Sequence, residues 1–131
     1  MTKHVLKILL FISTILVLTN CKKMGDDFDV YFFTDIENSA GPLTLFVEGK
    51  NKGELPNLKT SVAATNDTVI NNALHLTLKS GKYKLEAKDN QGNVKVSGYI
   101  KFRKNSDGGG GTMGGISSSS SGKVIVNKLY Y

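Results

Sequence analysis

Few residues in this chain are suited to nucleophilic or acid–base chemistry. Its 131 residues include one cysteine, Cys21, and one histidine after it, His75. A catalytic serine or cysteine needs a base held beside it, and no Gly-x-Ser-x-Gly sequence accompanies the serines. His75 alternates with Leu74 and Leu76, so we expect its side chain to face solvent. The pattern argues against a catalytic triad.

Carboxylates can pair for glycoside hydrolysis or hold a metal ion. The scattered candidates are Asp35, Glu37, Glu48, Glu54, Glu86 and Asp89. A chain of this length leaves little room for a cleft with opposed acids. The acidic group Asp26, Asp27 and Asp29 lacks the spaced glycine and the distant Glu of a calcium loop. We therefore expect no enzyme, no metal site and no cofactor.

The first 20 residues have the layout of a secretion signal. Lys3 and Lys7 precede an apolar or small stretch over residues 8–18, and Cys21 follows after Thr19 and Asn20. As a helix this stretch would span only about 16 Å, half the thickness of a hydrocarbon core. We expect a cleaved signal helix over residues 1–20 and no stable transmembrane span.

The cysteine indicates which kind of signal this is. Leu18-Thr19-Asn20-Cys21 resembles the lipobox of bacterial lipoproteins, in the looser form seen in Bacteroidota. The resemblance implies cleavage before Cys21 by signal peptidase II, a diacylglycerol thioether on its sulfur and acylation, for example by palmitate. Two or three chains suffice for stable anchoring. The alternative is an ordinary secretory signal or a structural cysteine, although no second cysteine exists to pair with Cys21.

Residues 21–27 are polar and charged, as expected of a flexible tether between a lipid and a folded domain. Acidic pairs at this position also resemble the surface-export signals of Bacteroidota lipoproteins. The resemblance implies a lipid-anchored protein of the bacterial cell envelope, on the periplasmic or the surface-exposed face of the outer membrane. A plain tether is the competing interpretation.

Size and charge restrict the partners of the exported part. Removing residues 1–20 leaves 111 residues, enough for one domain, which we place at residues 28–131. The loss of Lys3 and Lys7 takes the net charge from +6 to +4. The remaining lysines are scattered along alternating segments, so we expect no nucleic-acid partner. Weak attraction to acidic glycans or anionic lipid head groups stays open.

The sequence pattern in the first half of this domain predicts β-strands. A strand over residues 28–33 would carry apolar side chains on both of its faces, which predicts a central strand. Residues 43–47 alternate ahead of a glycine-bounded hairpin at 49–53. Pro56 removes a ladder donor, so the return strand should be short or at an edge. Residues 57–72 lack alternation and favour turns.

The second half continues the strand pattern. We expect a tight hairpin at Ser80–Gly81 between strands 74–79 and 82–87, then a turn at 89–93. A third strand follows over 94–102, where Gly98 marks a bulge or bend. Residues 106–122 are glycine and serine runs and predict a flexible loop. Gly108–Gly111 lacks the Lys-Ser/Thr of a phosphate loop.

The last segment regains strand character over 124–131. About seven short strands result, and two packed sheets are the simplest way to cover them. The predicted fold is therefore all-β, a small antiparallel β-sandwich.

Two segments carry a partial family resemblance. Residues 45–56 (Leu-Phe-Val-Glu-Gly-Lys-Asn-Lys-Gly-Glu-Leu-Pro) and 76–85 (Leu-Thr-Leu-Lys-Ser-Gly-Lys-Tyr-Lys-Leu) resemble the PEGA-type module of bacterial envelope proteins. Residues 80–87 are equally similar to transthyretin-like and carboxypeptidase-regulatory-like sandwiches. These resemblances imply a non-catalytic envelope module, with no functional residues to carry over.

Aromatic side chains are the remaining candidates for a site. The residues that could meet a partner are Tyr31, Phe33, Tyr99, Tyr130 and Tyr131. Tyrosine suits recognition because it combines apolar area with a hydroxyl group. Core or cross-strand packing explains these positions as well. The C-terminal strand could alternatively pair with the sheet edge of a partner.

The sequence thus favours a membrane-anchored envelope lipoprotein that acts as a binding or structural accessory module. Its expected partners are the membrane, through lipid on Cys21, and an envelope protein or glycan. The alternatives are a stoichiometric inhibitor or immunity-type lipoprotein and, less favoured by the residues, an enzyme acting on glycans or peptides.

Overall fold

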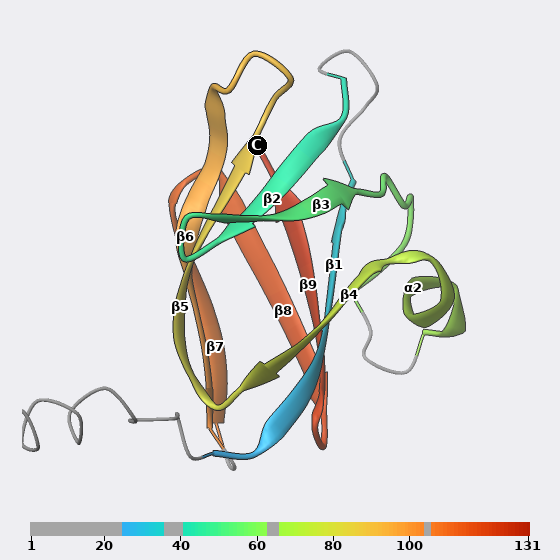
Figure 1. Ribbon diagram of the computed structural model, residues 1–131. Coiled ribbons are helices and arrows are strands. Elements are labelled where there is room, and N and C mark those ends of the chain that lie inside the picture. Colours follow the sequence, from blue (N-terminus) through green and yellow to red (C-terminus); the bar gives the residue numbers. More distant parts are fainter. Residues whose placement is uncertain (1–24, 36–40, 63–65, 104–105) are drawn as a thin grey trace, which may run out of the picture.

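In its described residues, the computed structural model is an all-β domain with one short helix (Figure 1). The structure describes residues 25–35, 41–62, 66–103 and 106–131. The elements are β1 (Asp27–Thr34), β2 (Leu43–Val47), β3 (Lys50–Leu55), α2 (Asp67–Asn72), β4 (Leu74–Lys79), β5 (Gly81–Lys88), β6 (Val94–Arg103), β7 (Ser106–Met113), β8 (Gly115–Ser121) and β9 (Val124–Tyr130). The predicted all-β sandwich is confirmed.

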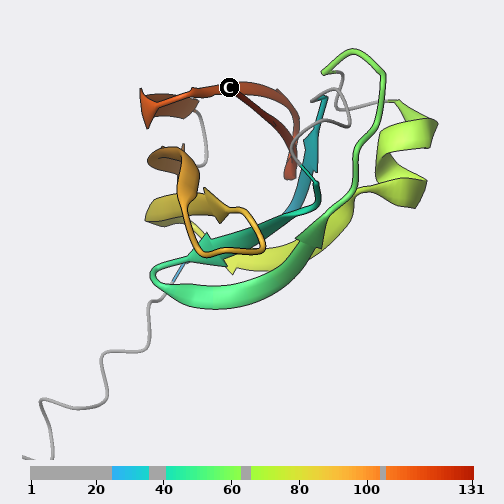
Figure 2. The same cartoon turned by 90° about the horizontal axis from the view of Figure 1, so that it is seen from above.

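The strands form two sheets that face each other. Sheet A has the order β4-β1-β9-β8, and sheet B has the order β3-β2-β5-β6-β7. Viewed along the strands, the two layers curve around a common interior (Figure 2). β1 is central, as its two apolar faces predicted, but it pairs with β9 in parallel. Sheet A is therefore mixed rather than purely antiparallel.

The space between the sheets holds the main core. Alternate residues of β1, β2, β5 and β6 point inward, because successive side chains of a strand face opposite ways. Phe32, Leu45 and Leu85 are fully buried there. At one end of the core the Phe28 and Phe102 ring centroids are 5.5 Å apart. The sandwich is thus closed by apolar packing.

Several local predictions are confirmed. β3, which ends just before Pro56, is an edge strand of sheet B. β5 and β6 form an antiparallel hairpin around residues 89–93. The register between β6 and β7 shifts between Ser97 and Gly98, at the predicted bulge. Each of these features follows from a residue whose local chemistry restricts pairing.

The Gly/Ser-rich segment 106–122 corrects one prediction. It forms two strands, β7 and β8, and so raises the strand count from the expected seven to nine in the described residues. β7 pairs along β6, and β8 pairs along β9. Each therefore lies beside a strand with strong β character. Pairing with that strand provides the hydrogen-bonding ladder, although Gly and Ser alone would not favour the strand conformation.

A second correction concerns Ser80 and Gly81. β4 and β5 belong to different sheets, β4 pairing with β1 and β5 with β2 and β6, so the predicted hairpin is wrong. Ser80 instead marks a corner at which the chain crosses from sheet A to sheet B. The Tyr83 hydroxyl donates a hydrogen bond to the Lys79 carbonyl oxygen across this corner (2.7 Å).

The segment 57–72 contains α2, where only turns were expected. The Asn66 side chain caps the helix by accepting a hydrogen bond from the Thr68 N–H (3.0 Å). α2 lies against the outer face of sheet A (Figure 1). Its Val69 packs with Phe33 and Val126 in a second, smaller buried cluster. Both faces of β1 are therefore covered.

Residues 1–24, which contain the predicted signal, Cys21 and most of the tether, lie outside the described residues. Within the described ranges no helix has the length and apolar character needed to cross a membrane.

A second corner, at Gly114 between β7 and β8, supplies a test of the fold. Gly114 has φ +66°, and an added Cβ would lie 2.7 Å from the Tyr130 carbonyl oxygen. Gly122 has a similar φ of +61° but open space around it. We expect Gly122→Ala to cost about 1–2 kcal/mol from the backbone conformation alone. Gly114→Ala should cost at least about 1 kcal/mol more because a backbone contact is added.

The free energy of unfolding in urea measures both variants. Equal losses would show that Gly114 makes no close approach to β9.

Candidate functional site

The five aromatic residues predicted to meet a partner do not form one site. Tyr31 and Phe33 lie on the outer face of sheet A, Tyr99 lies on the outer face of sheet B, and Tyr130 and Tyr131 lie at the end of β9. The large hydrophobic side chains that are exposed are Tyr99, Tyr130 and Tyr131, at 42%, 45% and 47%. The structure therefore divides the candidates into separate surfaces.

Phe33 is not available to a partner. It is fully buried in the cluster under α2, together with Val69 and Val126. The sequence could not reveal this, because the covering helix comes from a segment about 35 residues further along the chain. The prediction of Phe33 as a partner-binding residue is corrected.

Tyr31 is half-buried and stacks on His75. The two ring centroids are 4.7 Å apart with an interplanar angle of 21°. Asp29 Oδ1 lies 2.9 Å from His75 Nε2, and both side chains are about half exposed. The prediction that His75 faces solvent is confirmed. Since the stack places the Tyr31 and His75 rings face to face, it serves cross-strand packing, worth about 0.5–1.5 kcal/mol.

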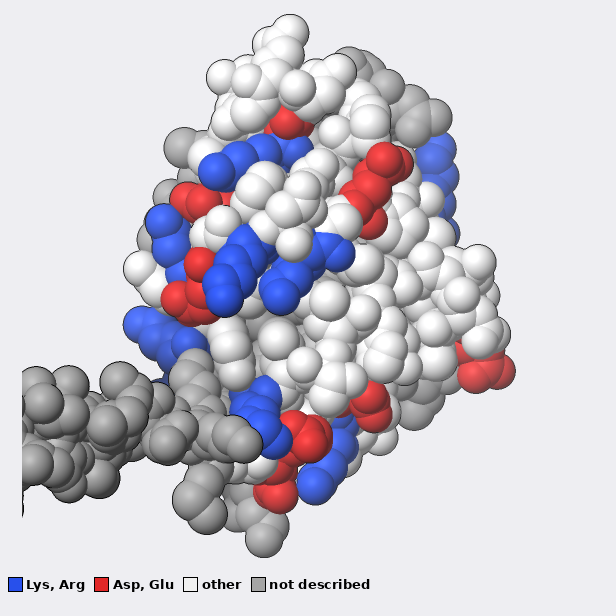
Figure 3. Space-filling model, viewed as in Figure 1, with Lys and Arg blue, Asp and Glu red and all other residues white. Residues whose placement is uncertain are grey.

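Tyr99 is covered by a cation. Lys82 Nζ lies 4.3 Å from the centroid of its ring, and Lys88 takes the same position over Phe46 at 4.5 Å. Both contacts are on the outer face of sheet B. Lysine side chains gather over β2, β3 and β5 in Figure 3, with acidic side chains among them, while the surface over β4 is mostly uncharged.

Tyr130 and Tyr131 form the most exposed aromatic pair. The Tyr130 ring lies against Gly115, where any Cβ would collide with it. Lys95 Nζ lies 5.9 Å from the Tyr131 ring centroid and 3.7 Å from Asp89 Oδ2. Two aromatic rings, a cation and a carboxylate thus lie together at one end of the sandwich, which we name the distal end.

The opposite, proximal end is where the described chain begins. β1 and β9 run in parallel, with Asp29 beside Val124 and Thr34 beside Leu129. The chain therefore enters at the Gly25 end and finishes at Tyr131, at the other end of the same sheet. The N-terminal residues and the exposed tyrosine pair are held apart by the full length of the strands.

A rigid turn supports the distal end. Asp89 Oδ1 accepts hydrogen bonds from the N–H groups of Gln91 (3.0 Å) and Asn93 (2.8 Å), and Asp89 Oδ2 accepts one from Asn93 Nδ2 (3.0 Å). The side-chain hydrogen bond from Asn93 lowers the pKa of Asp89, and the backbone donors add to this effect. The Asp89 carboxylate therefore stays charged and holds the turn through these hydrogen bonds.

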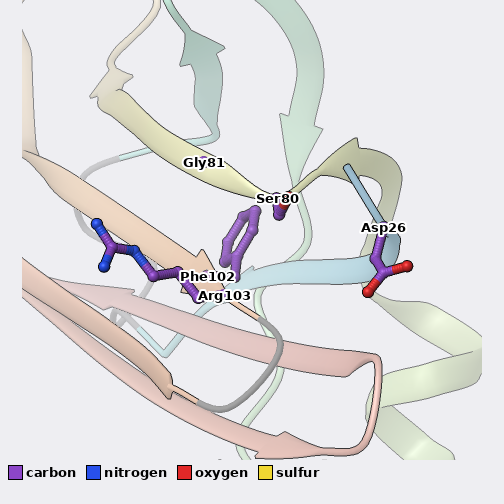
Figure 4. Close-up of a pocket in the computed structure, with 5 residues that line it drawn as sticks. All are labelled: Asp26, Ser80, Gly81, Phe102 and Arg103. Atoms are coloured by element: carbon purple, nitrogen blue, oxygen red, sulfur yellow. The ribbon is translucent and has the colours of Figure 1, made fainter. Parts of the chain in front are cut away.

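The proximal end contains two shallow hollows. One of about 270 Å³ is lined by Asp26, Ser80, Gly81, Phe102 and Arg103, and one of about 290 Å³ is lined by Asp26, Phe28, Gly122 and Lys123. In Figure 4 the Asp26 and Arg103 side chains extend away from each other on either side of the Phe102 ring. The charged groups that line the first hollow do not converge on a common point.

The candidate acids are also dispersed. Asp35 pairs with Lys128 (2.9 Å), and Glu48 Oε1 accepts the Lys84 N–H (2.6 Å). Glu37 lies outside the described residues. Within the described ranges no three His, Cys, Asp or Glu side chains are grouped closely enough to hold a metal ion. Asp35 and Glu48 therefore belong to separate structural contacts.

Glu86 is the acid with the most ionic contacts in sheet B. Its carboxylate lies 3.0 Å from Lys84 Nζ and 3.6 Å from Lys88 Nζ. The hydrogen bond from Lys84 holds the pKa of Glu86 below its usual 4.5, and the same contact raises the pKa of Lys84. One carboxylate thus neutralises part of a strand rich in lysine.

One buried polar residue, Asn127, is not among the residues predicted from the sequence. Asn127 is fully buried on β9, where its Oδ1 accepts a hydrogen bond from Ser118 Oγ (2.7 Å). Its Nδ2 has no partner among the described residues. The signal was present, since Asn127 interrupts an otherwise apolar strand start.

Comparison of the chain with protein-family models, with curated proteins and with solved structures found no match. The geometry of the described residues therefore carries the functional argument.

The loss of stability on replacement by alanine should differ between the buried Phe33 and the exposed Tyr99. We expect Phe33→Ala to cost about 3–5 kcal/mol because a fully buried ring is removed. Tyr99→Ala should cost less than about 1 kcal/mol, since it loses mainly one exposed cation–π contact. Urea denaturation monitored by circular dichroism measures both. A small loss for Phe33→Ala would place that ring at the surface.

The ion pairs of Glu86 predict a pH effect. Because the pKa of Glu86 is lowered on folding, its contribution is present above pH 4.5 and is lost as the pH falls through the folded value. Glu86→Gln should therefore be less stable than the parent chain at neutral pH, and the difference should shrink at about pH 3. Glu54→Gln is the control on an exposed acid.

Urea midpoints at the two pH values measure this difference. A difference between Glu86→Gln and the parent chain that does not change with pH would contradict the assigned ion pairs.

Proposed function

We propose that the chain is a membrane-anchored lipoprotein of the bacterial cell envelope whose sandwich is a non-catalytic binding or accessory module. The observation that carries the proposal is the opposite placement of its two ends. An anchor at Cys21 would attach to the proximal end, and the exposed pair Tyr130 and Tyr131 is at the distal end. The domain is thereby built to present its distal end away from a membrane.

Dimensions support this arrangement. The six residue steps from Cys21 to Asp27 reach at most about 20 Å when fully extended. The eight residues of β1 add about 26 Å along the strand. Tyr131 would therefore be held within about 50 Å of the bilayer surface, a distance at which other envelope components are accessible.

The distal end has the chemistry of a recognition surface. Tyr130 and Tyr131 offer apolar area with hydroxyl groups, and Lys95 with Asp89 adds charge of both signs. Aromatic faces of this kind bind both sugar rings and protein side chains. We therefore propose an envelope protein or glycan as the partner.

The rigid turn at Asp89–Asn93 favours a second candidate function. A loop fixed by three hydrogen bonds to Asp89 beside an exposed aromatic ring is suited to entering the cleft of another protein. A stoichiometric inhibitor or immunity-type lipoprotein would use it in this way. Protection of a susceptible strain from a toxin or hydrolase would favour this function, and unaltered sensitivity would count against it.

The anchor is tested by Cys21→Ser in the full precursor. We expect incorporation of radiolabelled palmitate to be lost, and the protein to leave the membrane fraction or to accumulate uncleaved. Labelling of the parent protein and cell fractionation measure this. Unchanged membrane retention of Cys21→Ser would contradict the lipoprotein proposal.

The distal surface is tested by Tyr131→Ser, with Tyr99→Ser as the matched control on another face. Cross-linking of the lipidated protein in its own membranes should give a recurring adduct that Tyr131→Ser weakens about tenfold and Tyr99→Ser leaves unchanged. Equal adducts from both variants would contradict a partner site at the distal end.

A further inference from the structure

The outer face of sheet B carries a group of cations near the proximal end. Lys82 on β5 and Lys101 and Arg103 on β6 all point outward and are exposed. Their backbone neighbours Tyr83, Ile100 and Phe102 point inward and are buried. We call Lys82, Lys101 and Arg103 the basic face.

Several other lysines of the domain have carboxylate partners, whereas Lys50, Lys52 and Lys59, like the basic face, have none among the described side chains. Lys84 and Lys88 share Glu86, Lys79 pairs with Asp27, and Lys123 pairs with Asp26. Among the described side chains, which exclude those of residues 106–113, no ion pair joins the basic face to a carboxylate.

The pairing register makes this arrangement unfavourable in the isolated domain. Lys82 and Lys101 are directly opposite each other in the β5–β6 ladder. Like charges at directly opposed positions destabilise a sheet. Lys82 partly relieves the repulsion by lying over the Tyr99 ring. A bound anion would offset the repulsion, so the arrangement points to an anionic ligand.

The location indicates which anion is within reach. Arg103 and Gly81 line the same hollow as Asp26, and the Ser80 N–H donates to the Asp26 carbonyl oxygen (2.8 Å) (Figure 4). The basic face therefore adjoins the point at which the described chain begins. If Cys21 carries a lipid, this is the end of the domain that faces the bilayer.

We propose that the basic face binds the phosphate groups of anionic phospholipids in the membrane that holds the anchor. The inference rests on the proposed function for its location and deepens it, because it gives the domain a second membrane contact. The contact brings only the proximal part of the outer face of sheet B to the membrane surface, so the distal end stays farther from the bilayer.

The test uses the chain from residue 21 to residue 131 with Cys21→Ser, which keeps every described residue and removes the anchor. It is sedimented with vesicles of phosphatidylcholine alone and of phosphatidylcholine with about one third phosphatidylglycerol, a composition that gives a negative surface potential. We expect binding only to the anionic vesicles, and a steep loss of that binding with added salt.

The decisive comparison is between two double variants with the same loss of charge. Each basic residue near an anionic surface contributes about fivefold to binding, so Lys82→Gln with Lys101→Gln should weaken it roughly 25-fold. The control, Lys59→Gln with Lys95→Gln, removes two cations from the distal end, because residues 57–58 bond to Thr34 and Lys95 lies beside Tyr131. It should weaken binding less than threefold. Circular dichroism verifies that both variants are folded.

Other outcomes overturn the proposal. Equal weakening by the two double variants would show an effect of net charge alone. No binding of the parent chain to anionic vesicles, or equal binding to neutral ones, would remove the lipid ligand. Displacement by millimolar inorganic phosphate would assign a site for free phosphate, and preference for a soluble acidic polysaccharide would assign a glycan. Palmitate labelling tests the anchor separately, so failure of one proposal is distinguishable from failure of the other.

Discussion

The parallel pairing of the first strand with the last is the constraint on which the rest of this domain depends. Parallel neighbours require a long crossover connection, and here everything between β1 and β9 serves as that connection. The pairing buries β1 between β4 and β9 and leaves its two faces to be covered by sheet B and by α2. It also sends the two ends of the chain to opposite ends of the sandwich.

This separation of the ends gives the surface its polarity. Aromatic rings, Lys95 and the Asp89 turn gather where the chain finishes, and the basic face lies where the described chain begins. Glu86 neutralises Lys84 and Lys88 between them. Lys82, Lys101 and Arg103 keep their charge without such a partner among the described side chains. A domain with one end for a membrane and the other for a partner fits this distribution.

The composition of residues 106–122 predicted a flexible loop, whereas the segment forms the strands β7 and β8. Glycine and serine bury too little apolar surface to fix a conformation by themselves. β7 and β8 nevertheless lie on β6 and β9, whose backbone groups provide a ladder along their whole length. Tertiary pairing overrides local preference there, and the close approach at Gly114 uses the absence of a side chain.

Alternation and turn chemistry in the sequence determined the strands outside the Gly/Ser-rich segment, the edge position of β3, the β5–β6 hairpin and the bulge at Gly98. The prediction at Cys21 has a different basis, the signal layout and the lipobox resemblance of residues 18–21, and it rests on the sequence alone. Only the tertiary structure decided that Ser80 turns a corner, that Phe33 lies under α2, and that Lys82 opposes Lys101 beside the chain's entry. The physical reason is that period-two alternation fixes which side chains share a face of a strand, whereas the choice of neighbouring strand depends on packing between distant segments.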